Sequence, residues 1–135
     1  MIKQFIQGQE TDGELYCLMG QWALSQAVHE QLGIAVTGEA GDVWLVKANK
    51  DGEPAGFAQL RVLKNNKGHL RYLFSESYPV KLELGNAVIK LAKATGLESI
   101  YTNERRDSPV MPHFDFKKIT DNGKTKFCRW ERSLA

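Results

Sequence analysis

The stretch HLRYLFSESYPVKLELGNAVIKLAKATGLESIYTN, residues 69–103, decides the fold. Its first residues, His69–Phe74, have the composition of a strand, and its last residues, Ser99–Asn103, form a shorter one. Between them, apolar residues recur at helical spacing, which predicts a helix from about Lys81 to Thr95 that ends at Gly96. The residues on that helical face are Leu84, Val88, Leu91 and Ala92. Because such crossovers are right-handed, the two strands are predicted to lie parallel in one sheet.

The residues that precede this crossover predict an antiparallel meander. Val43–Ala48 and Ala55–Leu63 have strand composition, and the hairpin signal Lys50-Asp-Gly52 separates them. A second turn, Asn65–Gly68, leads into the strand that begins at residue 69. Connections this short cannot contain a crossover, so the three strands are predicted to be antiparallel neighbours.

The N-terminal part predicts one strand and one helix. Ile2–Ile6 alternates weakly and predicts a short strand. Thr11 or Asp12 is a suitable cap for a helix that continues to about Leu32, where Gly33 ends it.

The C-terminal part predicts an irregular turn followed by a hairpin. Prolines interrupt residues 105–112, which argues against a full helix there. Phe116–Ile119 and Lys126–Glu131 flank Asp121-Asn-Gly123, a strong hairpin signal. The whole chain, 1–135, is therefore predicted to be one α/β (α+β) domain, with the order β-α-β-β-β-α-β-turn-β-β around a mixed sheet.

Composition excludes several classes of protein. The net charge of +2 does not favour a polyanionic partner, and Cys17 and Cys128 lie too far apart for a metal knuckle or a disulfide scaffold. His29 and His69 have no acidic or cysteine companions, so no metal site is predicted. No apolar run is long enough to cross a membrane, and the start of the chain becomes polar too early for a signal peptide. We therefore expect a soluble, cytoplasmic protein.

The predicted order of elements resembles the GNAT N-acetyltransferase superfamily over roughly residues 1–132. Asp51–Phe57 resembles the family's turn between its second and third strands, Gly85-Asn86-Ala87 resembles the end of its phosphate loop, and Phe114–Lys118 resembles the segment before its last hairpin. The resemblance implies a GNAT-like mixed sheet and an acyl-CoA-dependent N-acyltransferase. It also implies acetyl-CoA as cosubstrate, an amine as acceptor, and a homodimer as a possible assembly.

The resemblance also implies where the cosubstrate lies. In the family, the strands before and after the crossover helix diverge, and the pantetheine arm lies in the gap between them. The diphosphate then rests on free amides at the start of the helix, where the helix dipole favours an anion. The residues implied for this seat are Leu73, Phe74, Ser75, Lys81, Leu82, Leu84, Gly85, Asn86 and Ala87.

Two departures from the family pattern keep other functions open. Leu82 stands where the family has Arg or Gln, and Glu83 and Leu84 stand where it has glycine, although Lys81 supplies a positive charge nearby. The family's catalytic tyrosine has no counterpart near Met111. A first alternative is a GNAT-shaped binding or structural protein without catalysis, of the kind that bacteriophages encode as accessory proteins. A second is a small nucleic-acid-binding module that uses the basic C-terminal hairpin.

Three residues are candidates for the catalytic chemistry. Glu76 follows the third meander strand and is either a general base or a solvated loop acid. His113 carries an imidazole, a common group in acid–base catalysis, and is either an acid–base group or a packed turn residue. Tyr72 either donates a proton to the leaving thiolate or packs in the core. A backbone amide near Phe74 is the expected donor to the oxyanion.

Overall fold

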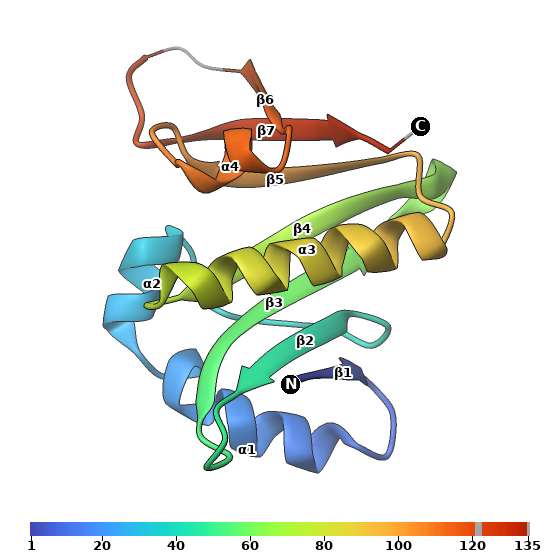
Figure 1. Cartoon of the computed structure of the whole chain (residues 1–135), viewed down its shortest axis with the longest axis vertical. Helices are drawn as coiled ribbons and strands as arrows, with labels where there is room; N and C mark the ends of the chain where they lie inside the picture. The colour runs from blue at the N-terminus through green and yellow to red at the C-terminus, as the bar shows by residue number, and fades with distance from the viewer. Residues whose placement is uncertain (121–122, 135) are drawn as a thin grey trace.

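The computed structural model describes residues 1–120 and 123–134, and seven strands form one mixed sheet in the order β1-β2-β3-β4-β5-β7-β6. Strands β1 (Ile2–Ile6), β2 (Val43–Ala48), β3 (Pro54–Val62) and β4 (Lys67–Ser75) are consecutive antiparallel neighbours. The short connections in the sequence had predicted this meander for β2, β3 and β4, and the structure confirms it. Figure 1 shows the sheet with both ends of the chain at its periphery.

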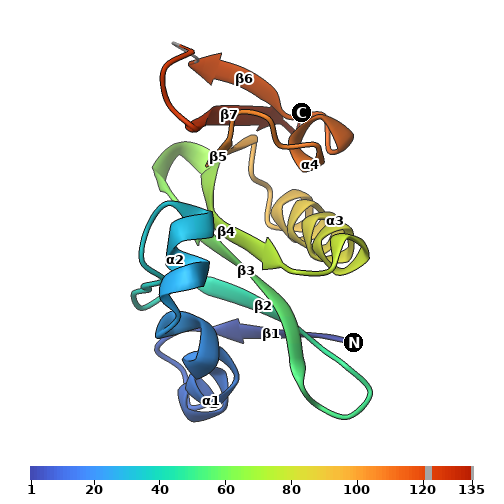
Figure 2. The ribbon, with the colours of Figure 1, turned by 90° about the vertical axis from the view of Figure 1, so that its left-hand side faces the viewer.

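Two short helices cover one face of the sheet, where the sequence had predicted one long helix. They are α1 (Asp12–Ala23) and α2 (Gln26–Leu32), and the prediction of one helix to Leu32 was wrong. The chain breaks because Ser25 caps α2, accepting a hydrogen bond from the Val28 amide at 3.3 Å. Gly33, with φ of +83°, ends α2 as expected. Figure 2 shows these helices on the side of the sheet opposite to α3.

Helix α3 (Tyr78–Ala94) crosses the other face and begins one turn earlier than predicted. The prediction of a start near Lys81 was wrong because it overlooked Ser77, which is the N-cap, and Pro79, which occupies the first turn. Leu84 and Val88 are completely buried under this helix, as their spacing predicted.

Strand β5 (Ser99–Arg105) runs parallel to β4, but the two strands pair over three positions only. The pairs are Lys67 with Ser99, Gly68 with Ile100, and His69 with Tyr101. Beyond them β4 carries a bulge at Arg71, because Gln59 of β3 faces Tyr72 while the next residue, Leu60, faces Leu70. The two strands then diverge, as Figure 1 shows.

The C-terminal part consists of a one-turn helix α4 (Val110–His113), β6 (Lys117–Thr120) and β7 (Phe127–Ser133). Asp115, in the segment that resembles the family's, adopts the left-handed conformation with φ of +63°, which glycine would favour. The predicted hairpin pairs β6 with β7, and its turn at Asp121 and Asn122 lies outside the described residues. Among the described residues, none of the helices has the length and hydrophobicity needed to span a bilayer.

Candidate functional site

The opening between β4 and β5, which we call the wedge, is bordered by two strand edges that lack a strand partner. On β4 the edge comprises residues 71–75, and on β5 it comprises residues 102–105. Each strand is paired along its other edge, β4 with β3 and β5 with β7. Main-chain groups along the wedge are therefore available to an extended ligand that carries amides of its own.

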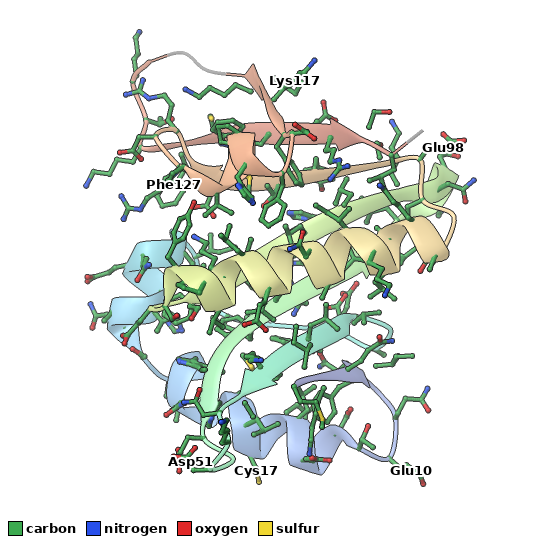
Figure 3. All side chains as sticks on the ribbon, in the orientation of Figure 1. Glu10, Cys17, Asp51, Glu98, Lys117 and Phe127 are labelled. Atoms are coloured by element: carbon green, nitrogen blue, oxygen red, sulfur yellow. The ribbon has the colours of Figure 1, made fainter. Side chains whose placement is uncertain are left out.

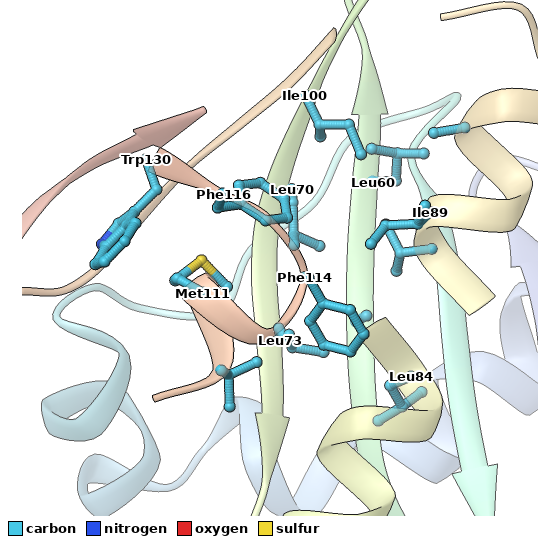
Figure 4. Packing of buried hydrophobic residues seen from close by; sticks show 14 of the residues in the cluster. Leu60, Leu70, Leu73, Leu84, Ile89, Ile100, Met111, Phe114, Phe116 and Trp130 are labelled. Atoms are coloured by element: carbon cyan, nitrogen blue, oxygen red, sulfur yellow. The ribbon is translucent and has the colours of Figure 1, made fainter. Parts of the chain in front are cut away.

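On the α3 side, side chains fill the wedge. Phe114, which directly follows α4, is 5% exposed and packs between Leu73 of β4 and Leu84 of α3 (Figure 4). A Cβ atom added at Gly85 would clash with the Phe114 ring. Gly85 is therefore required for the close approach of this ring to α3.

An ion pair crosses the same side of the wedge. Lys81 of α3 lies 3.6 Å from Glu104 of β5, and both side chains are largely buried. Two residues further along the helix, Glu83 pairs with Lys47 of β2 at 2.9 Å and points away from the wedge. The segment that was predicted to hold a diphosphate thus uses its charged side chains for contacts within the protein.

The residues implied for the cosubstrate separate into two groups. Leu73, Phe74 and Ser75 lie on the β4 border of the wedge, as predicted, although Phe74 points into the aromatic cluster on the α1 side. The second group, Lys81–Ala87, lies inside α3 rather than ahead of it. Its amides donate to carbonyls of the preceding turn, so a cradle of free amides just before Asn86 does not fit this structure. The wedge offers strand edges to an extended arm that carries amides, whereas the helix segment lacks the free amides that a diphosphate requires.

The three predicted catalytic residues lie apart from one another. Tyr72 is 1% exposed on the α1–α2 side, where its hydroxyl donates to the carbonyl of Ala35 at 2.8 Å and accepts from the amide of Thr37 at 3.0 Å. Glu76 is exposed and lines a hollow of about 460 Å³ next to Ser77. His113 is exposed at the end of α4. Their catalytic roles remain predictions.

On the α2 side, a cleft of about 1070 Å³ lies beside the wedge and meets it at Arg105, the last residue of β5. One wall consists of α2 and residues 33–35, and the other consists of Arg105, Lys126 and Phe127. Figure 3 labels Phe127 of this second wall. The first wall rests on β4, because Tyr72 holds Ala35 there, and the second belongs to β5 and β7. We call this space the α2-side cleft. Arg105 thus belongs both to this cleft and to the β5 edge of the wedge.

The sequence had offered no role for His29, which lines the α2-side cleft. Its Nε2 lies 2.8 Å from the carbonyl oxygen of Ala23, so this nitrogen carries the proton. The other ring nitrogen, Nδ1, then keeps its lone pair. A histidine in an accessible cleft with a fixed tautomer can accept a proton from a substrate.

A polar network fixes the segment that leads from α2 to β2. Asp42 is 1% exposed and accepts two hydrogen bonds from Arg61, at 2.7 and 2.8 Å. Burial alone would raise the pKa of Asp42, but the bonds from Arg61 and the Glu39 amide hold it below its usual value. Arg71, the bulged residue, donates to the carbonyl of Thr37 at 3.1 Å. The α2 wall of the cleft is thus held in place.

A stacked cluster lies on the same face of the sheet, over β4, β5 and β7. The His69 ring stacks on Tyr101 at 4.3 Å, and the guanidinium of Arg129 covers the same ring at 4.0 Å. Burial, together with the charges of Arg71, Arg61 and Arg129, lowers the pKa of His69 to about 4. His69 is therefore neutral at physiological pH.

The described residues contain no group of three or more metal-ligating side chains.

Comparison with known proteins identifies the fold. The sequence matches no protein-family model and no curated protein. The structure is similar to an acyl-CoA N-acyltransferase from Pseudomonas aeruginosa, with a TM-score of 0.75 and 15% identity over 98% of this chain and 99% of that one. It is also similar to a GNAT-family acetyltransferase from Staphylococcus aureus, with a TM-score of 0.64 and 16% identity over all of both chains.

A third similar structure contains coenzyme A. It is N-acetylglutamate synthase from Neisseria gonorrhoeae complexed with coenzyme A and N-acetyl-glutamate, with a TM-score of 0.61 and 11% identity over all of this chain and 35% of that one. The chain therefore has the GNAT fold, which confirms the fold predicted from the sequence.

Proposed function

We propose that this protein is an acyl-CoA-dependent N-acyltransferase that moves an acyl group, in the simplest case acetyl, to an amine. The observation that carries the proposal is the wedge, whose β4 and β5 edges are free of strand partners and whose β5 edge meets the α2-side cleft at Arg105. The acceptor would enter through this cleft, because Phe114 and the pair Lys81–Glu104 fill the opposite side.

The chemistry requires few protein groups. The bound thioester supplies an electrophilic carbonyl, so that the new C–N bond forms while the C–S bond breaks and the thiolate leaves with a proton. A main-chain N–H on the β4 border near Phe74 would donate to the carbonyl oxygen as it becomes negative. The proximity of the amine and the thioester in the wedge would account for most of the rate.

His29 is the best-placed group to accept the proton of the amine. It lies in the α2-side cleft, from which the amine would arrive, and its Nδ1 keeps a lone pair because Nε2–H is donated to Ala23. Glu76 and His113 lie outside this cleft, so they serve as comparison positions in the test below.

The test combines binding and turnover. We expect acetyl-CoA and coenzyme A to bind in isothermal titration, and we expect thiol release that depends on an amine when a panel of amines is supplied. His29→Gln should lower turnover at least about 100-fold, since Gln can still donate to Ala23 but cannot accept a proton. Glu76→Gln and His113→Gln should retain more than about a third of the activity. If neither acetyl-CoA nor coenzyme A binds at millimolar concentration, the proposed enzymatic function is wrong.

A second candidate function is a GNAT-shaped binding protein without a cosubstrate. The observation that favours it is the helical conformation of Lys81–Ala87 together with the packing of Phe114 on Gly85. The titration above separates the two functions. The nucleic-acid-binding alternative would instead give binding to DNA or RNA that weakens steeply with salt.

A further inference from the structure

We infer that this chain recognises its acyl donor through the pantetheine arm and the thioester, and gains almost no affinity from the nucleotide half of coenzyme A. The inference rests on the proposed function. Its ligand class is any acyl-pantetheine thioester, whatever group carries the arm.

The first argument concerns the start of α3, where a diphosphate would need free amides. Of the residues in the first turn, Pro79 has no N–H, and the Val80 amide faces the Ser77 hydroxyl at 3.5 Å. The Lys81 amide donates to the Ser77 carbonyl at 3.0 Å. This leaves the amide of Tyr78, and one amide is a poor seat for a diphosphate, which helices bind with several.

The charged side chains around the start of α3 also disfavour a diphosphate. Three carboxylates lie around the first turns of α3, namely Glu76, Glu83 and Glu104. The two lysines there, Lys47 and Lys81, already pair with Glu83 and Glu104, at 2.9 and 3.6 Å. A diphosphate here would have to displace an ion pair to gain either lysine as a partner.

Access of a phosphate to α3 is blocked at Gly85. The glycine that would let a phosphate approach the helix, Gly85, is covered by the Phe114 ring, which a single added methyl group would touch. Phe114 is 5% exposed and belongs to the same apolar cluster as Leu84 and Val88. The small residue therefore serves the packing of the protein against itself.

The pantetheine arm, in contrast, can pair with main-chain groups of the two strand edges. Pantetheine contains two amide groups on an extended chain, and the wedge presents two strand edges without strand partners, at 71–75 and 102–105. An extended chain of amides binds such an edge as an added strand would. Affinity is thus expected to come from the arm.

The inference is tested by titrating the full-length protein with coenzyme A, with pantetheine, and with adenosine 3′,5′-bisphosphate, which is the nucleotide fragment. We expect coenzyme A and pantetheine to bind with dissociation constants within about threefold of each other, and the fragment not to compete at millimolar concentration. Coenzyme A binding that is more than about 30-fold tighter than pantetheine binding would overturn the inference. Binding of neither thiol would overturn the proposed function as well.

A variant in the α2-side cleft tests the alternative seat for phosphates. Arg105 and Lys126 are cationic and line this cleft. Lys126→Gln is expected to leave the affinities for coenzyme A and pantetheine equally unchanged. A tenfold loss for coenzyme A alone would show that the nucleotide half is held there, and this result would overturn the inference.

Discussion

The two sides of the wedge are built from the same pair of strands but differ in what covers them. On the α3 side, Phe114 and the pair Lys81–Glu104 fill the space, and the contacts are mainly apolar. On the α2 side, a cleft of about 1070 Å³ stays open, and hydrogen bonds around Asp42 and Tyr72 hold its wall. The α3 side therefore maintains the stability of the fold, while the α2 side is available for a ligand.

The largest effect is expected from removing the apolar contact that closes the α3 side. Phe114→Ala should lower the free energy of unfolding by about 4 kcal/mol, because a buried aromatic ring is replaced by a cavity. Urea denaturation measures this change. The control Val62→Ala truncates an apolar side chain that is 48% exposed, and it should change stability by less than about 0.5 kcal/mol. Equal effects of the two variants would contradict the assigned packing.

The next effect is a loss of stability at low pH, caused by His69 on the α2 side of the sheet. His69 has a pKa of about 4 in the folded protein and about 6.5 when unfolded, so the unfolded state binds more protons between these values. The contribution of His69 to the free energy of unfolding is therefore fully present above pH 6.5. It falls as the pH drops toward 4, by about 2 kcal/mol between pH 7.5 and pH 5.

The control for this pH dependence is His69→Gln, which should flatten the stability profile between pH 5 and 7.5 in urea denaturation. Asp42 acts at lower pH, since its pKa is depressed and its contribution is lost only as the pH falls below its usual value near 3.8. An unchanged slope in the variant would assign the pH dependence to another group.

A smaller effect is expected from overpacking the α3 side. Gly85→Ala should destabilise the protein by about 2 kcal/mol, because the added methyl group meets the Phe114 ring. In the Phe114→Ala background the same change should cost less than about 1 kcal/mol, as the clash has been removed. A double-mutant cycle with additive costs would show that Gly85 is needed for another reason.

The smallest effect is expected for the ion pair on the same side. Lys81→Met should lower the free energy of unfolding by about 1 kcal/mol, because the two charged groups are 3.6 Å apart and Glu104 keeps the hydrogen bond from the Arg105 amide at 2.9 Å. Thermal unfolding at low and high salt measures it. A loss of several kcal/mol would mean that Glu104 cannot tolerate the absence of its partner.

Much of the fold followed from periodicity and turn residues. The meander strands, the parallel strand at Ser99 and the end of α2 at Gly33 are where local patterns placed them. The errors were local as well, since the caps Ser25 and Ser77 were present in the sequence and were not recognised. The site was less predictable. Phe114, His29 and Glu104 come from three different elements, and no spacing along the chain relates them to one another.

The sequence by itself determined the order of the elements and the crossover between β4 and β5, because apolar periodicity and turn chemistry act over a few residues. Only the tertiary structure decided that Gly85 packs against Phe114 and that a cleft on the α2 side brings Arg105 of β5 close to α2. The physical reason is that these features depend on contacts between residues far apart in the chain, whose distance is set by the packing of whole elements.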